Sequence, residues 1–213
     1  MSAAKTNIRE RVLKAAMPDI AREGFTDAVL EKAARKLDMR PIEAKRAFPN
    51  GAAGLAEEFS RLADERMAAK MKGLKDKSLT ARIRNAVRFR IEALEPHRNV
   101  ARRAGSFFAM PQNAPLGMKL VYRTVDAMWR AAGDRSTDFN FYTKRATLAC
   151  VYGSTLLFWL NDDSKDNAKT WEFLDHRLAD VMAFEKFKGA ARQALSEFPD
   201  PLGVFGRTAR KAR

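Results

Sequence analysis

The stretch that decides the fold is GFTDAVLEKAARKLDMRPIEAKRAFPNGAAGLAEEF, residues 24–59. Gly24 is typical of a helix end, and Thr26 or Asp27 can cap the helix that follows. Apolar residues then recur at helical spacing, and Pro41 is a favourable first residue for a short third helix. The stretch therefore predicts three short helices in a helix-turn-helix arrangement, leading into a longer helix.

Outward from this stretch, helical spacing of apolar residues continues over most of the chain, and we predict an all-α fold of about nine helices. Residues 146–160 carry no charge but are fewer than the about 20 residues that a membrane span needs. They are expected to form a buried central helix, in which Cys150 is an inert, packed thiol. The pattern divides the chain into a helix-turn-helix-like region at 1–50, a helical bundle at 51–183, and an amphipathic helix with a basic tail at 184–213.

The formal net charge of +14 at pH 7 is unevenly placed along the chain. Residues 1–60 are close to neutral at +2, whereas residues 61–110 carry +8 and residues 186–213 carry +5. Contacts to phosphate dominate DNA affinity, so this distribution predicts a retained fold for which DNA is an unlikely partner. The candidate recognition helix at 41–47 offers two cations and one acid, but no Gln, Asn, Ser, Thr or Tyr to read or anchor on DNA.

Residues 126–145, DAMWRAAGDRSTDFNFYTKR, place two amphipathic helical pieces around a polar turn, with more aromatic and acidic residues than a turn needs. This run and WEFLDHRLADVMAFEKFK at 171–188, with weaker matches in RIEALEPH and MPQNAP, resemble the TetR-like accessory proteins of ubiquinone biosynthesis, the rpsU-divergently transcribed family. Members of that family are lipid-binding partners of demethoxyubiquinone hydroxylase. The resemblance implies a TetR-like fold, a homodimer formed through the C-terminal bundle, and a helper role.

Carried onto this chain, the resemblance implies that the hydroxylase docks on the run at 126–145. The candidate contacts are Met128, Asp138, Phe141 and Tyr142. Aromatic anchors ringed by polar groups fit the composition of interface hot spots. The alternative is that the aromatic side chains pack the bundle, which is the favoured interpretation for Trp129 and Phe139.

The resemblance also implies a cavity for an isoprenoid, quinone or phospholipid ligand, with affinity supplied by buried apolar area. The candidate lining residues are Phe107, Phe108, Met110, Leu120, Val121, Leu148, Tyr152 and Leu156. Small residues on facing helices would leave the space, and these are Ala104, Gly105, Ala149 and Gly153. The alternative is a filled core, and the sequence does not separate the two.

The C-terminal region has aromatic and aliphatic residues at helical spacing with cations between them. The candidate membrane-binding residues are Phe184, Phe187, Lys188, Leu195 and Phe198. This pattern is typical of a helix lying in a membrane surface, where basic residues meet anionic headgroups. The alternative is a helix docked on its own domain or on a dimer partner.

A single cysteine excludes an intramolecular disulfide framework and suits a reducing compartment. The N-terminus lacks the apolar segment of a secretory signal, and the first patterned helix begins by about Ile8, which leaves no room for a removable transit segment. We therefore expect a protein of the bacterial cytoplasm, peripheral to the inner membrane.

The sequence contains no residue pattern that indicates catalysis. The chain has two histidines, no Glu-x-x-His pair for a di-iron bundle site, and no Gly-rich phosphate loop. We expect a protein that is not an enzyme and binds no metal or cofactor. The rival hypothesis is a TetR-type transcriptional regulator that binds DNA and a small hydrophobic ligand, and a weaker one is a lipid carrier without a protein partner.

Overall fold

The computed structural model describes residues 3–76, 78–134 and 140–196, with side chains described for those between residues 8 and 183, residue 140 excepted. All regular structure in these ranges is helical, which confirms the predicted all-α fold. The chain divides into two compact units, residues 1–174 and residues 175–213. The three-part division expected from the sequence stays a prediction.

The first unit begins with three helices in the predicted places: α1 (Ala3–Glu23), α2 (Asp27–Lys36) and α3 (Pro41–Ala47). Local chemistry sets their ends. Gly24 ends α1 with a φ of +83°, a backbone conformation that favours glycine. Thr26 caps α2, because its hydroxyl oxygen accepts a hydrogen bond from the backbone N–H of Val29 at 3.2 Å.

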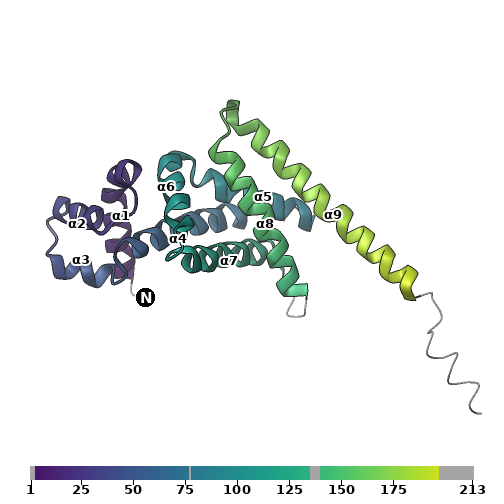
Figure 1. Cartoon of the computed structure of the whole chain (residues 1–213), viewed down its shortest axis with the longest axis horizontal. Coiled ribbons are helices and arrows are strands. Elements are labelled where there is room, and N and C mark those ends of the chain that lie inside the picture. The colour runs from purple at the N-terminus through teal and green to yellow at the C-terminus, as the bar shows by residue number, and fades with distance from the viewer. Residues whose placement is uncertain (1–2, 77, 135–139, 197–213) are drawn as a thin grey trace, which may run out of the picture. The chain divides into compact units, whose positions relative to one another are not determined.

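The rest of the first unit is a helical bundle built on α4 (Gly51–Lys72), α5 (Leu79–Glu92), α6 (Arg98–Ala109), α7 (Ala114–Ala131) and α8 (Asn140–Leu160). Short 3₁₀ helices at Glu95–His97 and Lys165–Asn167 precede α6 and α9 (Ala168–Ser196). In Figure 1, α4 runs from the group of α1, α2 and α3 to the bundle, and it packs against helices of both groups. Within the bundle α7 packs against both α4 and α8.

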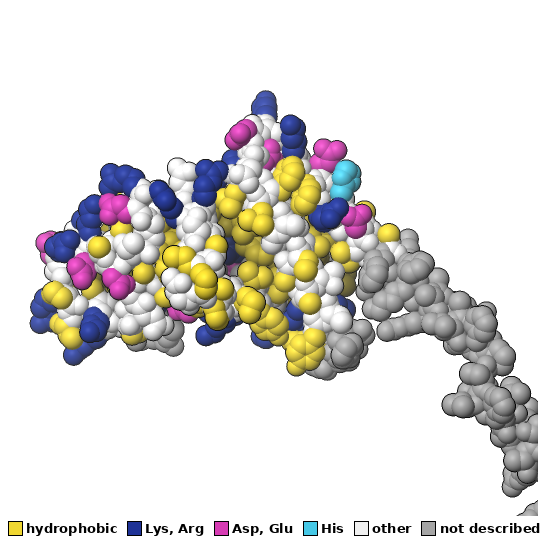
Figure 2. Space-filling view, viewed as in Figure 1, with side chains coloured by type: hydrophobic (Ala, Val, Ile, Leu, Met, Phe, Trp, Pro, Cys, Tyr) yellow, Lys and Arg dark blue, Asp and Glu magenta, His cyan; other side chains and the backbone are white. Residues whose placement is uncertain are grey.

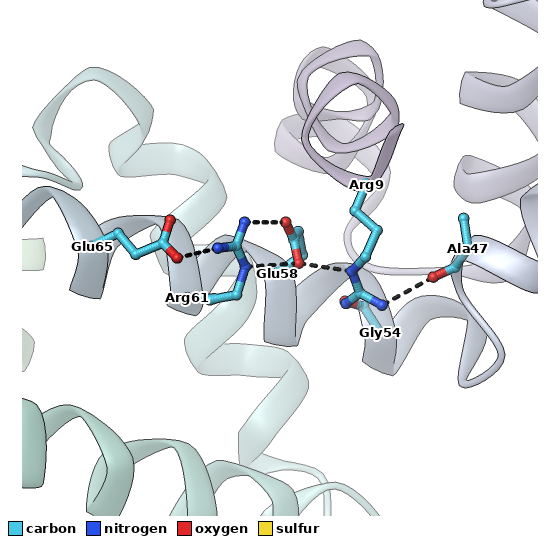
Figure 3. A network of polar contacts seen from close by, with 6 residues as sticks. All are labelled: Arg9, Ala47, Gly54, Glu58, Arg61 and Glu65. Carbon is cyan, nitrogen blue, oxygen red and sulfur yellow. Dashed lines mark hydrogen bonds and ion pairs between the residues drawn. The ribbon is translucent and has the colours of Figure 1, made fainter. Parts of the chain in front are cut away.

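A buried carboxylate ties the helix-turn-helix region to α4 (Figure 3). Glu58 on α4 is fully buried and accepts hydrogen bonds from Arg9 of α1 at 2.8 Å and from Arg61 at 2.6 Å. Arg9 also donates to the backbone carbonyl of Ala47 at the end of α3, at 2.9 Å. Because one guanidinium holds α1, the end of α3 and α4 together, the network sets how the short helices pack.

Two arginines of α6 bind the end of α8. Arg98 donates to the backbone carbonyls of Trp159 and Asp162, and Arg102 donates to that of Leu160. Cations are favourable at a helix C-terminus, where the carbonyl groups lack partners within the helix. Part of the basic charge at residues 61–110 therefore has a structural role.

The uncharged helix is only partly buried. Trp159 and Thr155 are fully buried, whereas Leu157 is 64% exposed and Cys150 is also exposed. The expectation of a packed, buried Cys150 is therefore wrong, because Cys150 lies on an exposed side of α8. Figure 2 shows apolar side chains gathered on the surface around α8.

The second unit contains the remainder of α9, which begins in the first unit and ends at Ser196. Its existence agrees with the helix predicted for this part of the chain. Among the helices that the structure describes, none combines the length and hydropathy required to cross a bilayer.

Candidate functional site

An apolar cavity of about 120 Å³ lies within the bundle of the first unit. Its walls come from α4, α5, α6, α7 and α8. Five of the eight residues expected to line a lipid cavity contribute to them: Phe108, Leu120, Val121, Tyr152 and Leu156. Leu157 also lines the cavity and is 64% exposed, so it stands at the mouth.

The other three expected residues do not line the cavity. Phe107 is buried and packs its ring 5.8 Å from that of Phe25. Leu148 is buried elsewhere in the bundle, and Met110 is 39% exposed just after α6. All three residues are apolar, but the helical spacing of apolar residues does not predict which side of a packed helix faces a cavity.

Two of the four small residues expected beside the cavity contribute to its wall. Ala104 and Gly105 line the cavity, whereas Ala149 and Gly153 do not. A Cβ added at Gly105 would meet no atom within 4 Å. Gly117 also lines the cavity, but a Cβ there would lie 2.9 Å from the Cβ of Phe108. Gly105 is exposed, so the open space beside it lies at the surface, whereas Gly117 allows α6 and α7 to approach closely.

A buried arginine lies in the wall of this apolar cavity. Arg90 on α5 is 3% exposed, and its Nε donates to Asp64 on α4 at 2.6 Å. Its Nη2 donates to the hydroxyl of Ser60 at 3.2 Å, and Thr124 donates to the same Asp64 carboxylate at 2.9 Å. Nη1 is buried and has no hydrogen-bond partner among the described residues.

The electrostatics of this cluster keep both Arg90 and Tyr152 protonated. Burial by itself would lower the pKa of Arg90, but interactions with Tyr152 and Asp64 outweigh it and raise that pKa above its ordinary value. Burial raises the pKa of Tyr152, so its hydroxyl remains a hydrogen-bond donor near neutral pH. The cluster thus offers donors beside an apolar wall.

Arg90 was not among the predicted site residues, although its position in the sequence carries a signal. The position falls on the face of α5 that also carries Ile83 and Val87, both of which are buried. Arginine is rarely buried unless it is paired. A cation on an apolar helical face is therefore a candidate for a functional or pairing role.

The candidate partner surface lies at the start of α8, next to the C-terminal part of α7. Tyr142 is 66% exposed, and its ring lies edge-on to that of Phe141 at 5.2 Å. Phe141 in turn lies under the guanidinium of the buried Arg145, 3.3 Å from the ring centroid. Arg145 pairs with Asp126 at 2.8 Å. A charged network therefore orients this aromatic pair at the surface.

Two of the expected partner contacts need comment. Met128 is fully buried, so its expected place on the partner surface is wrong: its position on α7 faces the bundle core. Asp138 lies outside the described residues, as does Phe139. Trp129 packs as expected, and its indole N–H donates to the backbone carbonyl of Lys144 at 3.3 Å.

The expected membrane-binding side chains also lie outside the described part. The backbone positions of Phe184, Phe187, Lys188 and Leu195 fall within α9, but their side chains are not described, and Phe198 lies beyond it. Membrane contact through these residues stays a prediction.

One of the cations next to the candidate recognition helix α3 is paired with an acidic residue. Arg40, just before α3, donates to Glu43 at 2.7 Å. Within the described residues, no group of three or more His, Cys, Asp or Glu side chains could hold a metal ion. The expectations of weak DNA binding and of no metal or cofactor stay predictions.

The family model and the known proteins that match this chain point to the same family. The COQ9 family model matches residues 114–185. The rat protein "Ubiquinone biosynthesis protein COQ9, mitochondrial" is 33% identical over 183 residues, which are 82% of this chain and 59% of the relative. Its human counterpart is 32% identical, with 82% and 58% covered, and the Drosophila melanogaster protein is 29% identical, with 84% and 56% covered. The chain thus spans less than two thirds of these relatives.

The fold also has a solved counterpart. The crystal structure of a TetR transcriptional regulator from Nitrosomonas europaea superposes with a TM-score of 0.66, at 24% identity, covering 81% of this chain and 97% of that one. This likeness confirms the predicted TetR-like fold.

One expectation is overturned and one is confirmed by these relatives. The expected bacterial cytoplasmic location is contradicted, because the rat, human and fly proteins are all named as mitochondrial. That expectation rested on the start of the chain and on its single cysteine. Over the region that these matches share, the chain belongs to the COQ9 family, as the resemblance implied.

Proposed function

We propose that this protein is a non-enzymatic accessory protein of ubiquinone biosynthesis that binds an isoprenoid or quinone lipid in the cavity of its bundle. The relatives are named as ubiquinone biosynthesis proteins, which supports the pathway. The observation that carries lipid binding is the apolar cavity itself, to which five of the expected residues contribute.

The size of the cavity limits how a lipid would lie. Its volume of about 120 Å³ is below the roughly 300–1,000 Å³ of typical small-molecule pockets. A long tail would therefore extend out past Leu157, along the exposed apolar side chains of α7 and α8. Burying these side chains and the tail together supplies the affinity.

The first test is native mass spectrometry of the purified protein, followed by organic extraction and identification of any bound lipid. Ala104→Leu should abolish lipid retention, because Ala104 is a buried residue of the cavity wall and a larger side chain there takes up space in the cavity. Ala149→Leu is the matched control, since Ala149 does not line the cavity, and it should retain lipid. Protein that carries no lipid and shifts duplex DNA at physiological salt would replace this proposal with the rival regulator.

We propose further that the bound lipid is presented to the demethoxyubiquinone hydroxylase, with Phe141, Tyr142 and Asp138 at the contact. The exposure of Tyr142 beside an oriented aromatic partner supports this surface. Tyr142→Ala should weaken the hydroxylase complex by about tenfold or more, as expected for an aromatic hot spot. Pull-down with the hydroxylase checks this. Tyr122→Ala, a second exposed tyrosine, should leave the affinity unchanged.

The homodimer is part of the same proposal. Exposed apolar side chains on α7 and α8, among them Met118 at 72% and Leu157 at 64%, would favour burial against a second copy. A monomer in sedimentation equilibrium at micromolar concentration would contradict it.

A further inference from the structure

Binding of an apolar tail does not explain the charged group in the cavity wall. Arg90 lies among apolar lining residues, and a tail needs no hydrogen bonds. We propose that Arg90 determines head-group specificity: its Nη1 donates a hydrogen bond to an uncharged oxygen acceptor on a ring attached to the apolar chain. This inference rests on the proposed lipid binding and goes beyond it, because it assigns the chemistry of the head group.

The first argument is the unused donor. Nε of Arg90 is taken by Asp64 at 2.6 Å and Nη2 by Ser60 at 3.2 Å, while Nη1 is buried without a partner among the described residues. A buried donor without a partner costs free energy, more so in a charged group. A ligand oxygen at Nη1 removes that cost, so the cavity favours ligands that carry an acceptor over pure hydrocarbons.

The second argument is the charge balance, which selects the kind of acceptor. The Asp64 carboxylate already neutralises Arg90 and also accepts a hydrogen bond from Thr124. A phosphate or carboxylate on the ligand would bring a second anion next to Asp64 in a site of low dielectric, where like charges repel strongly. A carbonyl, hydroxyl or ether oxygen accepts the same hydrogen bond without adding charge.

The third argument is size. The cavity of about 120 Å³ is comparable to the engineered apolar cavity of about 150 Å³ that holds a benzene ring. One six-membered ring therefore fits the space, and the attached chain leaves at the mouth by Leu157. Tyr152 supplies an aromatic wall 5.9 Å from the Arg90 guanidinium, against which such a ring packs. A benzoquinone ring with an apolar chain meets all three conditions.

The experiment compares three probes that share a geranyl chain, by isothermal titration calorimetry on the full chain after delipidation. The probes are geranyl-1,4-benzoquinone, geranylbenzene and geranyl phosphate. The wild-type protein should bind the quinone about tenfold more tightly than the hydrocarbon, the effect of one hydrogen bond to a charged donor. The phosphate should bind more weakly than the quinone.

Arg90→Lys keeps the positive charge beside Asp64 but removes the guanidinium fork, so it should abolish the preference for quinone over geranylbenzene. Arg88→Lys is the matched control on the same helix, because Arg88 pairs with Glu92 and does not line the cavity. That control should keep the tenfold preference. If Arg90→Lys does not fold by circular dichroism, the wild-type comparison among the three probes decides alone.

The outcomes separate this inference from the proposed function. Equal binding of quinone and hydrocarbon by the wild-type protein overturns the role of Arg90 but leaves the lipid cavity in place. Tightest binding of geranyl phosphate overturns the preference for an uncharged acceptor. Failure of all three probes to bind overturns the lipid-binding proposal itself, and the head-group assignment with it.

Discussion

At the scale of single residues, the most consequential group outside the cavity is Glu58. Burial by itself would raise the pKa of this carboxyl, but hydrogen bonds from Arg61 and Arg9 outweigh burial and hold the pKa below its ordinary value. A carboxylate whose pKa is lowered on folding stabilises the folded state at pH values above its unfolded pKa. That stabilisation is lost as the pH falls from about 4.5 through the folded-state pKa.

Replacing Glu58 with Gln should therefore lower the free energy of unfolding by about 3 kcal/mol at pH 7, because the half-buried Arg9 and Arg61 lose their shared, buried counter-charge. The deficit should shrink below pH 4.5, because the carboxylate of the unfolded wild-type chain then takes up a proton and the wild-type advantage is lost. Urea unfolding followed by circular dichroism at pH 7 and pH 3.5 measures both values.

Glu65 provides the control for this substitution. It pairs with the same Arg61 but its side chain is 59% exposed, and exposed pairs contribute little. Glu65→Gln should change the free energy of unfolding by no more than about 0.5 kcal/mol at either pH. Equal effects of the two substitutions would mean that burial of Glu58 does not set its contribution.

At the scale of helices, a glycine on α6 has room for a side chain and a glycine on α7 does not. Gly105→Ala should raise the free energy of unfolding by roughly 0.5–1 kcal/mol, because alanine favours a helix and its Cβ meets no neighbour. Gly117→Ala should lower it by about 1 kcal/mol, because its Cβ would lie 2.9 Å from the Cβ of Phe108 and the two helices must move apart.

Thermal unfolding distinguishes the two glycine substitutions. For a chain of this length, 1 kcal/mol shifts Tm by about 2–4 °C, so Tm should rise for the α6 variant and fall for the α7 variant. Shifts of the same sign would contradict the close packing of α6 on α7.

At the scale of the whole molecule, the positive charge beyond residue 185 predicts attachment to anionic membranes. Each Lys or Arg near such a surface contributes about 1 kcal/mol. Replacing Lys186, Lys188 and Arg192 with Gln should therefore weaken binding to phosphatidylserine-containing vesicles by about a hundredfold. Vesicle co-sedimentation at low and high salt measures the change.

The matched control for membrane attachment replaces three exposed cations in another part of the chain: Lys14 on α1, and Lys45 and Arg46 on α3. This variant has the same net charge as the tail variant, so a general charge effect would weaken both equally. Retained vesicle binding by this control variant locates the attachment in the tail, and equal loss contradicts it.

The sequence by itself determined the all-α class and the start of α3 at Pro41, because caps, turn residues and helical spacing act over a few neighbouring positions. The resemblance added the family and five residues of the cavity wall.

Only the tertiary structure decided which apolar positions face the cavity and which face the core, so that Val121 lines the cavity and Met128 is buried in the core. It alone brought Arg90 onto Asp64, 26 positions apart in the chain. The physical reason is that side-chain burial and long-range pairing depend on how helices pack, whereas the helices themselves are specified by local chemistry.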